Sequence, residues 1–217
     1  MNASGEICGF LEDEEDLPDG IQSQPCQEPT WNGREHCLWH AKVDDKPVDQ
    51  VANAWPDAPE RIDGIYLNKI ELGDRISFNG RILYSGSFCE ADLSEADFRD
   101  AILDQSDFTG SKLRSARFNT SQTSIREVCF EKATIIGARF QQSTLHKSDF
   151  TNASGSSARF QFADAAEAIF NGSNLKDSSF ISTNLRSANL EGASLSKADL
   201  GNANLEKALL NGADLRG

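Results

Sequence analysis

A period of five residues runs through most of this chain of 217 residues. Within residues 89–108 every fifth residue is leucine or phenylalanine, and the residue two positions before each of them is alanine or serine. The period extends back to Phe78 and forward to Leu215, with one interruption, where seven residues separate Phe118 from Ile125. Nine units precede the interruption and nineteen follow it. The repeat therefore covers most of the chain and has to be explained before anything else.

Neither an α-helix nor a flat strand accommodates this period. Residues five apart are separated by about 500° around a helix, so their side chains spread over its whole surface. Along a strand, an odd spacing alternates between the two faces. The period closes if the chain turns a corner every five residues, so that four units complete one square coil. The large and the small residue of each unit then both point inward, and the small one fits the narrow corner.

The repeat resembles the motif of the pentapeptide-repeat family, A-(D/N)-L-x-x. The units ANLEG, ASLSK, ADLGN and ANLEK, which span residues 188–207, match it almost letter for letter. The resemblance implies an all-β fold, a right-handed quadrilateral β-helix, which is a solenoid whose coils contact only their neighbours. Twenty-eight units predict about seven coils, stacked at ~4.8 Å into a rod roughly 34 Å long.

The predicted solenoid domain spans residues 62–217. It is irregular in its first coil and at two later repeat positions. It begins with a wider capping coil, in which isoleucine replaces the small residue and one extra residue precedes Phe78. Later in the repeat, Gly155 and Ala165 are the only repeat positions without a large apolar side chain. We expect neighbouring side chains, with Phe162 as a candidate, to fill the space, because empty core volume is destabilising.

The first 77 residues differ from the repeat in composition. They carry 17 acidic and 6 basic residues, a net charge of −11, against −2 for residues 78–217. Val48, Val51 and Trp55 follow Pro47 at helical intervals, which predicts a short helix within a linker over residues 45–61. All three tryptophans precede residue 60, and we expect them to form a small core rather than a binding platform.

Cysteine and histidine are concentrated near the N-terminus. Four of them have the spacing C-x17-C-x10-C-x2-H, namely Cys8, Cys26, Cys37 and His40. Structural zinc sites take four tetrahedral nitrogen and sulfur ligands, and a segment of about forty residues is too short to fold around its own apolar core. We therefore predict a zinc-binding head over residues 1–44, with His36 as the alternative to His40. Free thiols and an iron–sulfur centre are the other interpretations.

The sequence indicates no catalytic centre. It contains no G-x-S-x-G, no glycine-rich phosphate loop and no H-E-x-x-H. A filled solenoid also offers no concave pocket of the size that small molecules need. We therefore predict a protein that is not an enzyme. No apolar run is long enough for a membrane helix and the start of the sequence has no signal-peptide pattern, so we expect a cytoplasmic protein.

Charges on the repeat are arranged by face, because every fourth unit lies on the same face. Arg117, Arg139 and Arg159 each precede a phenylalanine of one face and are expected to stack in a column, one per coil. Like charges directly opposite each other in a ladder are unfavourable. Two explanations remain open. Either the side chains fan apart and pair with nearby acids such as Asp97, or the column is a docking stripe for an acidic partner.

We predict a non-catalytic interaction scaffold whose solenoid surface binds a protein partner. The alternative is a DNA mimic that modulates an enzyme such as gyrase, as the resemblance implies for some members of the family. DNA carries one charge per ~1.7 Å, or about 20 over the length of the rod, whereas the repeat has a net charge of only −2. Mimicry is therefore the weaker explanation. Direct nucleic-acid binding is disfavoured by the acidic head.

The last coil raises the question of self-association. Leu210 and Leu215 continue the apolar ladder to the last residues of the sequence. An uncovered coil end exposes apolar side chains and unpaired backbone groups, which favour edge-to-edge pairing. We expect either a longer natural chain or an end-to-end homodimer through this coil.

Overall fold

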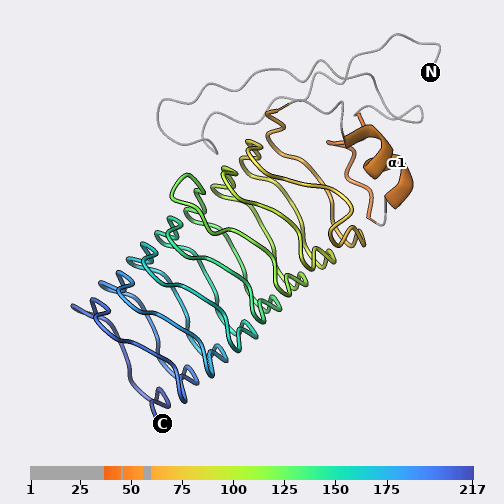
Figure 1. Cartoon of the computed structure of the whole chain (residues 1–217). Coiled ribbons are helices and arrows are strands. Elements are labelled where there is room, and N and C mark those ends of the chain that lie inside the picture. The colour runs from red at the N-terminus through yellow and green to blue at the C-terminus, as the bar shows by residue number, and fades with distance from the viewer. Residues whose placement is uncertain (1–36, 45, 56–59) are drawn as a thin grey trace, which may run out of the picture.

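The computed structural model describes residues 37–44, 46–55 and 60–217. The chain forms an elongated solenoid with one short helix, α1 (Val48–Ala54), at its N-terminal end (Figure 1). The helix predicted over residues 47–55 is thereby confirmed. With 7 residues, α1 is the only helix in the described part of the chain, and it is too short to cross a membrane.

The coils are held together by single parallel β-bridges rather than by continuous strands. The bridged residue is the one immediately before each repeat position, and we call it the outward position. It pairs with the outward position of the next coil, usually 20 residues away, as Asp149 does with Ile169. These pairs form four columns, one per face, so the predicted all-β solenoid is confirmed.

Both irregularities of the period are absorbed as extra residues in turns. The bridge between Tyr66 and Ser87 spans 21 residues, because one extra residue precedes Phe78. The bridge between Arg117 and Arg139 spans 22, because the loop after Phe118 adds two. After each irregularity the columns of bridged residues continue in register. Each residue therefore lies on the face that the sequence predicted for it.

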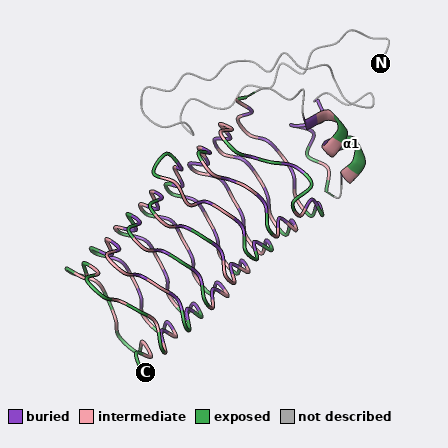
Figure 2. Cartoon of the chain, in the orientation of Figure 1, coloured by how far each residue is buried: buried purple, intermediate pink, exposed green. Residues whose placement is uncertain are grey.

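The interior is a ladder of aromatic and aliphatic side chains. Phe98 and Phe118 lie on the same face of adjacent coils and stack with their ring centroids 4.8 Å apart and their planes 1° apart. Phe98 and Phe108 lie on adjoining faces and meet edge to face at 5.7 Å and 87°. Both geometries are favourable for aromatic pairs. Figure 2 shows the resulting alternation of buried and more exposed residues along the coils, except in residues 196–217, none of which is buried.

The Asp or Asn of the motif shapes the turn that follows it. Eleven outward positions between residues 92 and 214 hold Asp or Asn, and each side chain accepts a hydrogen bond from the backbone N–H two residues later. Asp107, for example, accepts from Thr109 at 2.8 Å. Such local side-chain bonds stabilise turns. The motif thus combines a small inward residue, a turn-forming residue and a core residue.

Residues 37–44 and 46–55 cover the first coil and extend the aromatic ladder. The indole nitrogen of Trp55 donates to the carbonyl of Ser77 at 2.7 Å, and the ring lies 4.9 Å from Phe78. Trp39 packs edge to face on Trp55 at 5.5 Å. Both tryptophans are buried, which confirms the predicted small core for these two. Trp31 lies outside the described residues.

Gly155 is one of the two repeat positions without a large apolar side chain, and there is no empty space beside it. A Cβ added there would lie 3.0 Å from Leu175 and 3.1 Å from Ile135, because the side chains of the coils above and below fill the space. Phe162, expected as a candidate to fold inward, is instead 62% exposed. That expectation was wrong because Phe162 occupies the second residue of a turn, from which the side chain points away from the core.

Candidate interaction surface

The predicted arginine column exists on one face of the solenoid. We call this the arginine face, and its outward residues, from the first coil to the last, are Ser77, Asp97, Arg117, Arg139, Arg159, Ser179 and Asp199. Bridges pair Arg117 with Arg139 and Arg139 with Arg159. The three guanidinium groups therefore extend from adjacent coils, whose spacing in such stacks is about 4.8 Å.

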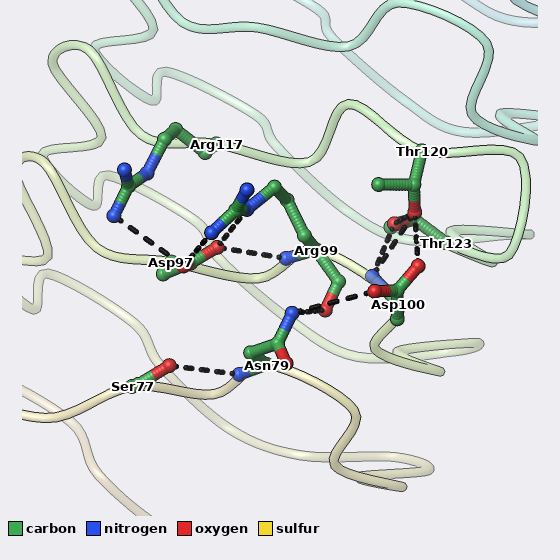
Figure 3. Close-up of polar contacts among 8 residues, drawn as sticks. All are labelled: Ser77, Asn79, Asp97, Arg99, Asp100, Arg117, Thr120 and Thr123. Atoms are coloured by element: carbon green, nitrogen blue, oxygen red, sulfur yellow. Dashed lines mark hydrogen bonds and ion pairs between the residues drawn. The ribbon is translucent and has the colours of Figure 1, made fainter.

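Asp97 compensates the first arginine of the column. Its carboxylate lies 3.4 Å from the Arg117 guanidinium and 2.7 Å from that of Arg99 (Figure 3). The hydrogen bond from Arg99, with a smaller contribution from the charge of Arg117, holds the pKa of Asp97 below its usual value. The expected pairing with Asp97 therefore holds for Arg117. The neighbouring turn is fastened by Thr120, which donates to Asp100 at 2.7 Å.

Arg139 and Arg159 differ from Arg117 in their surroundings. Both are exposed, and neither forms an ion pair or a hydrogen bond through its side chain with any described residue. The segments that carry them, residues 137–142 (GARFQQ) and 157–162 (SARFQF), contain no acidic residue. Two adjacent cations on this face are thus uncompensated, an arrangement that is unfavourable for the isolated solenoid.

The two arginines also lack the turn-forming hydrogen bond that Asp or Asn makes at eleven other outward positions. At an outward position, Asp or Asn would accept a hydrogen bond from the backbone N–H two residues later, which here belongs to Gln141 and Gln161. Neither N–H is hydrogen-bonded to a described residue. Arginine at positions 139 and 159 therefore adds no hydrogen bond to the turn that follows it.

A column of side-chain amides runs beside the arginines. Asn119, Gln141 and Gln161 each follow the buried phenylalanine of their coil, and their side-chain oxygens are buried without a hydrogen-bond partner among the described residues. Arg117 Nε and Ser179 Oγ, on the same face, are also buried and unpaired. A buried polar atom without a partner costs about 1–3 kcal/mol, so a group of them on one face asks for an explanation.

Phe162 stands at the turn that borders this surface. Its φ is 61°, a left-handed conformation that is unfavourable for a bulky side chain. Exposed aromatic side chains are frequent anchors in protein interfaces. Sequence reasoning missed this residue, although a signal was available. It lies two residues after a repeat position, where every other unit has glycine or a polar residue.

A second group of side chains lies at the N-terminal end, on residues 37–46. Cys37 Sγ is 3.3 Å from His40 Nδ1, and both residues are buried. Lys46 is buried beside them and donates hydrogen bonds to the carbonyls of Trp39 and Tyr66. Burial lowers the pKa of Lys46 to about 7, and the neighbouring Cys37 opposes this shift.

The structure thus brings two of the four predicted zinc ligands together. The other two, Cys8 and Cys26, and the alternative ligand His36 lie outside the described residues. Within residues 37–44, 46–55 and 60–217, no group of three or more His, Cys, Asp or Glu side chains is arranged to hold a metal ion.

Comparison with sequence families agrees with the coil architecture. The family model described as pentapeptide repeats matches in 8 copies, over residues 87–119, 133–172, 158–200 and 173–212. These ranges together include more than half of the chain. No curated protein is significantly similar in sequence.

Several solved structures resemble this one at low sequence identity. HetL, a pentapeptide repeat protein involved in heterocyst differentiation regulation in the cyanobacterium Nostoc, is 21% identical over 78% of this chain and 95% of its own, with a TM-score of 0.29. A pentapeptide repeat protein from the Arabidopsis thaliana thylakoid lumen is 23% identical over 52% and 63%, with a TM-score of 0.37. Full-length QnrB1, a plasmid-mediated fluoroquinolone resistance protein, is 18% identical over 71% and 93%, with a TM-score of 0.28.

Proposed function

Because this chain belongs to the pentapeptide-repeat family, we propose that it is a non-catalytic scaffold whose arginine face binds an acidic segment of a protein partner. The observation that carries this proposal is the pair Arg139 and Arg159. These are exposed cations without a described partner, in adjacent coils of one face.

The chemistry of the face suits an extended acidic peptide. Guanidinium groups bind carboxylates through paired, charge-assisted hydrogen bonds. The side-chain oxygens of Gln141 and Gln161 are buried without a partner, and a change of side-chain rotamer on binding would bring them to the backbone N–H groups of a peptide. Phe162 at the edge of the face provides an apolar contact. One ligand of this kind would therefore pair the cations, the amides and the aromatic ring together.

Charge argues against a nucleic acid as the ligand. The chain has a net charge of −13, which repels a polyanion at long range. Residues 78–217 contribute only −2, which is far from the charge density of a duplex and also disfavours DNA mimicry. A short acidic segment needs only the local positive field of the arginine face.

A peptide-binding experiment tests the proposal. The probe is a fluorescein-labelled peptide of alternating Glu and Ala, and its binding is followed by fluorescence anisotropy at low and moderate salt. We expect the double variant Arg139→Asn, Arg159→Asn to lose at least tenfold in affinity, because both cations are removed.

Lys112→Asn is the matched control. Lys112 is also an exposed cation at an outward position, but it lies on another face and pairs with Asp92 at 3.4 Å. Its replacement should leave the affinity unchanged. Equal binding by the wild type and the double variant, or an equal loss in the control, would show that the arginine face is not the binding surface.

A further inference from the structure

The surface around Arg139 and Arg159 is rich in hydrogen-bond donors without a partner. Both guanidinium groups are exposed and pair with no described residue. The backbone N–H groups of Gln141 and Gln161, which lie in the same two coils, form no hydrogen bond with a described residue either. The side-chain amide nitrogens of these glutamines are also without a described partner and, unlike the amide oxygens, are not buried. Each coil thus contributes three kinds of donor, which together suit an anion.

The described residues supply no anion for these donors. Along the arginine face, Asp97 lies two coils before Arg139 and is already paired with other arginines. On the opposite side, Asp199 lies two coils after Arg159. No acid in the described part of the chain forms an ion pair with either arginine. An anion that binds here must therefore come from outside the described residues.

The spacing of the two arginines favours one doubly charged group over two carboxylates. The coils that carry them are about 4.8 Å apart, whereas side chains on one side of an extended peptide are about 6.8 Å apart. Two carboxylates held closer than that repel each other. A phosphorylated serine or threonine instead concentrates a charge of about −1.5 to −2 on one group with three acceptor oxygens. Such a group can accept from both guanidinium groups at once and from the N–H donors beside them.

We infer that Arg139 and Arg159 bind a phosphorylated serine or threonine of the partner protein, an inference that rests on the proposed function. Other sources of phosphate are less suitable. The net charge of −13 opposes the approach of nucleic acids and anionic membranes, which carry many charges. A single phosphorylated side chain needs only the local field of the two arginines. Binding of the partner would then depend on its phosphorylation.

Three fluorescein-labelled peptides test this inference with the full-length chain by fluorescence anisotropy. All have the alternating Glu and Ala sequence, and they differ only at a central position, which holds serine, glutamate or phosphoserine. We expect the phosphoserine peptide to bind about tenfold more tightly than the serine peptide, because phosphorylation adds charge-assisted hydrogen bonds. The glutamate peptide should gain only about twofold, as one exposed ion pair does. Equal affinities for the phosphoserine and glutamate peptides would overturn the inference.

Two double variants then locate the phosphate. With Arg139→Asn and Arg159→Asn together, the advantage of phosphoserine over serine should disappear. With Arg139→Lys and Arg159→Lys together, the charges remain but the paired N–H donors of guanidinium are lost, so the advantage should fall about threefold. Lys112→Asn, which removes an exposed cation on another face, should retain the full advantage. An advantage that survives in the double asparagine variant would place the phosphate elsewhere and refute the site.

Competition separates a phosphorylated protein from other sources of phosphate. Inorganic phosphate, and vesicles of phosphatidylcholine and phosphatidic acid in equal parts, should displace the labelled phosphoserine peptide only at concentrations about tenfold above that of the unlabelled peptide, since neither offers its flanking carboxylates. Displacement by either at the concentration of the peptide would reassign the site to free phosphate or to a lipid headgroup.

The serine peptide distinguishes failure of this inference from failure of the proposed function. If its binding depends on Arg139 and Arg159 but phosphorylation adds nothing, the phosphate site is refuted and the acidic-peptide surface stands. If its binding is the same in the wild type and the double asparagine variant, the proposed function is refuted as well.

Discussion

At the scale of single residues, the outward positions of this protein differ in the side chains they hold, and two kinds bear on function. In eleven units an Asp or Asn accepts a hydrogen bond from the backbone of the following turn. At Arg139 and Arg159 the same position instead presents a cation to solvent. The exchange removes a turn-stabilising bond and places like charges in adjacent coils, so these residues are unfavourable for the fold alone.

We therefore predict that the protein becomes more stable when Arg139 and Arg159 are replaced by asparagine. Arg139→Asn together with Arg159→Asn would supply acceptors for the N–H groups of Gln141 and Gln161 and remove the repulsion. We expect the free energy of unfolding to rise by about 1–3 kcal/mol, since each of the two added hydrogen bonds contributes roughly 0.5–1.5 kcal/mol. Denaturant unfolding measures it.

The double alanine variant at the same two positions is the control. It removes the repulsion without adding an acceptor, so its gain in stability should be smaller. If the asparagine variant were less stable than the alanine variant, the assigned role of the Asx hydrogen bond at these positions would be wrong.

At the scale of the column, the residues of the neighbouring coils determine whether a charge is compensated and whether the space around a small residue is filled. Arg117 is compensated because Asp97 precedes it by one coil, whereas Arg139 and Arg159 have no acid in the equivalent places. Neighbouring coils have a similar effect in the core, where Ile135 and Leu175 fill the space left by Gly155 between them.

Asp97→Asn should extend the uncompensated column by one arginine. The amide oxygen can still accept the N–H of Arg99, which bonds to Asp97 Oδ1 at 3.2 Å, while the charge is lost. We expect the acidic peptide to bind about two- to fivefold more tightly, in line with ~0.2–1 kcal/mol for an exposed ion pair. Weaker or unchanged binding would contradict the placement of the ligand beside Arg117.

The same variant should alter acid stability in a defined direction. The pKa of Asp97 is depressed in the folded protein, so its carboxylate stabilises the fold above the unfolded pKa of about 3.9. This contribution is lost as the pH falls through the lower, folded pKa. Asp97→Asn should therefore show a shallower decline of the unfolding free energy below about pH 4, as measured by denaturant titration at each pH.

Gly155→Ala should destabilise the solenoid by about 1–3 kcal/mol, the usual cost of overpacking. The added Cβ would lie 3.0–3.1 Å from Leu175 and Ile135, which are themselves buried. Gly201→Ala is the control, because Gly201 is exposed and its added Cβ would approach only the side chain of Asp199. A higher melting temperature for Gly155→Ala than for the wild type would show that a void had been present.

At the scale of the whole molecule, the two ends of the solenoid differ. Trp39, Trp55 and α1 cover the first coil. On the last coil, Leu209 and Leu215 are 48% and 51% exposed, and Leu210 is only partly buried. Exposed apolar groups at the end of a stack favour association with another copy.

A second copy and a longer natural chain are the two expected coverings of this coil. For the 217 residues of the given sequence we predict a weak homodimer through the last coil, detectable by sedimentation over a range of concentrations. Leu210→Lys should give monomers, because a buried lysine at the contact is costly. Phe162→Ser, which removes an exposed apolar side chain elsewhere, should still dimerise. A single, concentration-independent monomer for the wild type would exclude this dimer.

The sequence alone determined the coil, its four faces and the contents of its core. A period of five is incompatible with both helix and strand, and bridges between equivalent positions follow directly from it, so Arg117, Arg139 and Arg159 could be placed in one column. The helix over residues 47–55 could be predicted because Pro47 and the apolar spacing of Val48, Val51 and Trp55 are local signals.

Only the tertiary structure decided which of these groups are compensated. The pairing of Arg117 with Asp97, the outward position of Phe162 and the unpaired amide oxygens depend on side-chain conformations between coils, which no spacing specifies. The contact of His40 with Asp63 likewise joins residues 23 positions apart. The repeat encodes backbone register, whereas the polar contacts that distinguish one coil from the next arise only when the coils are stacked.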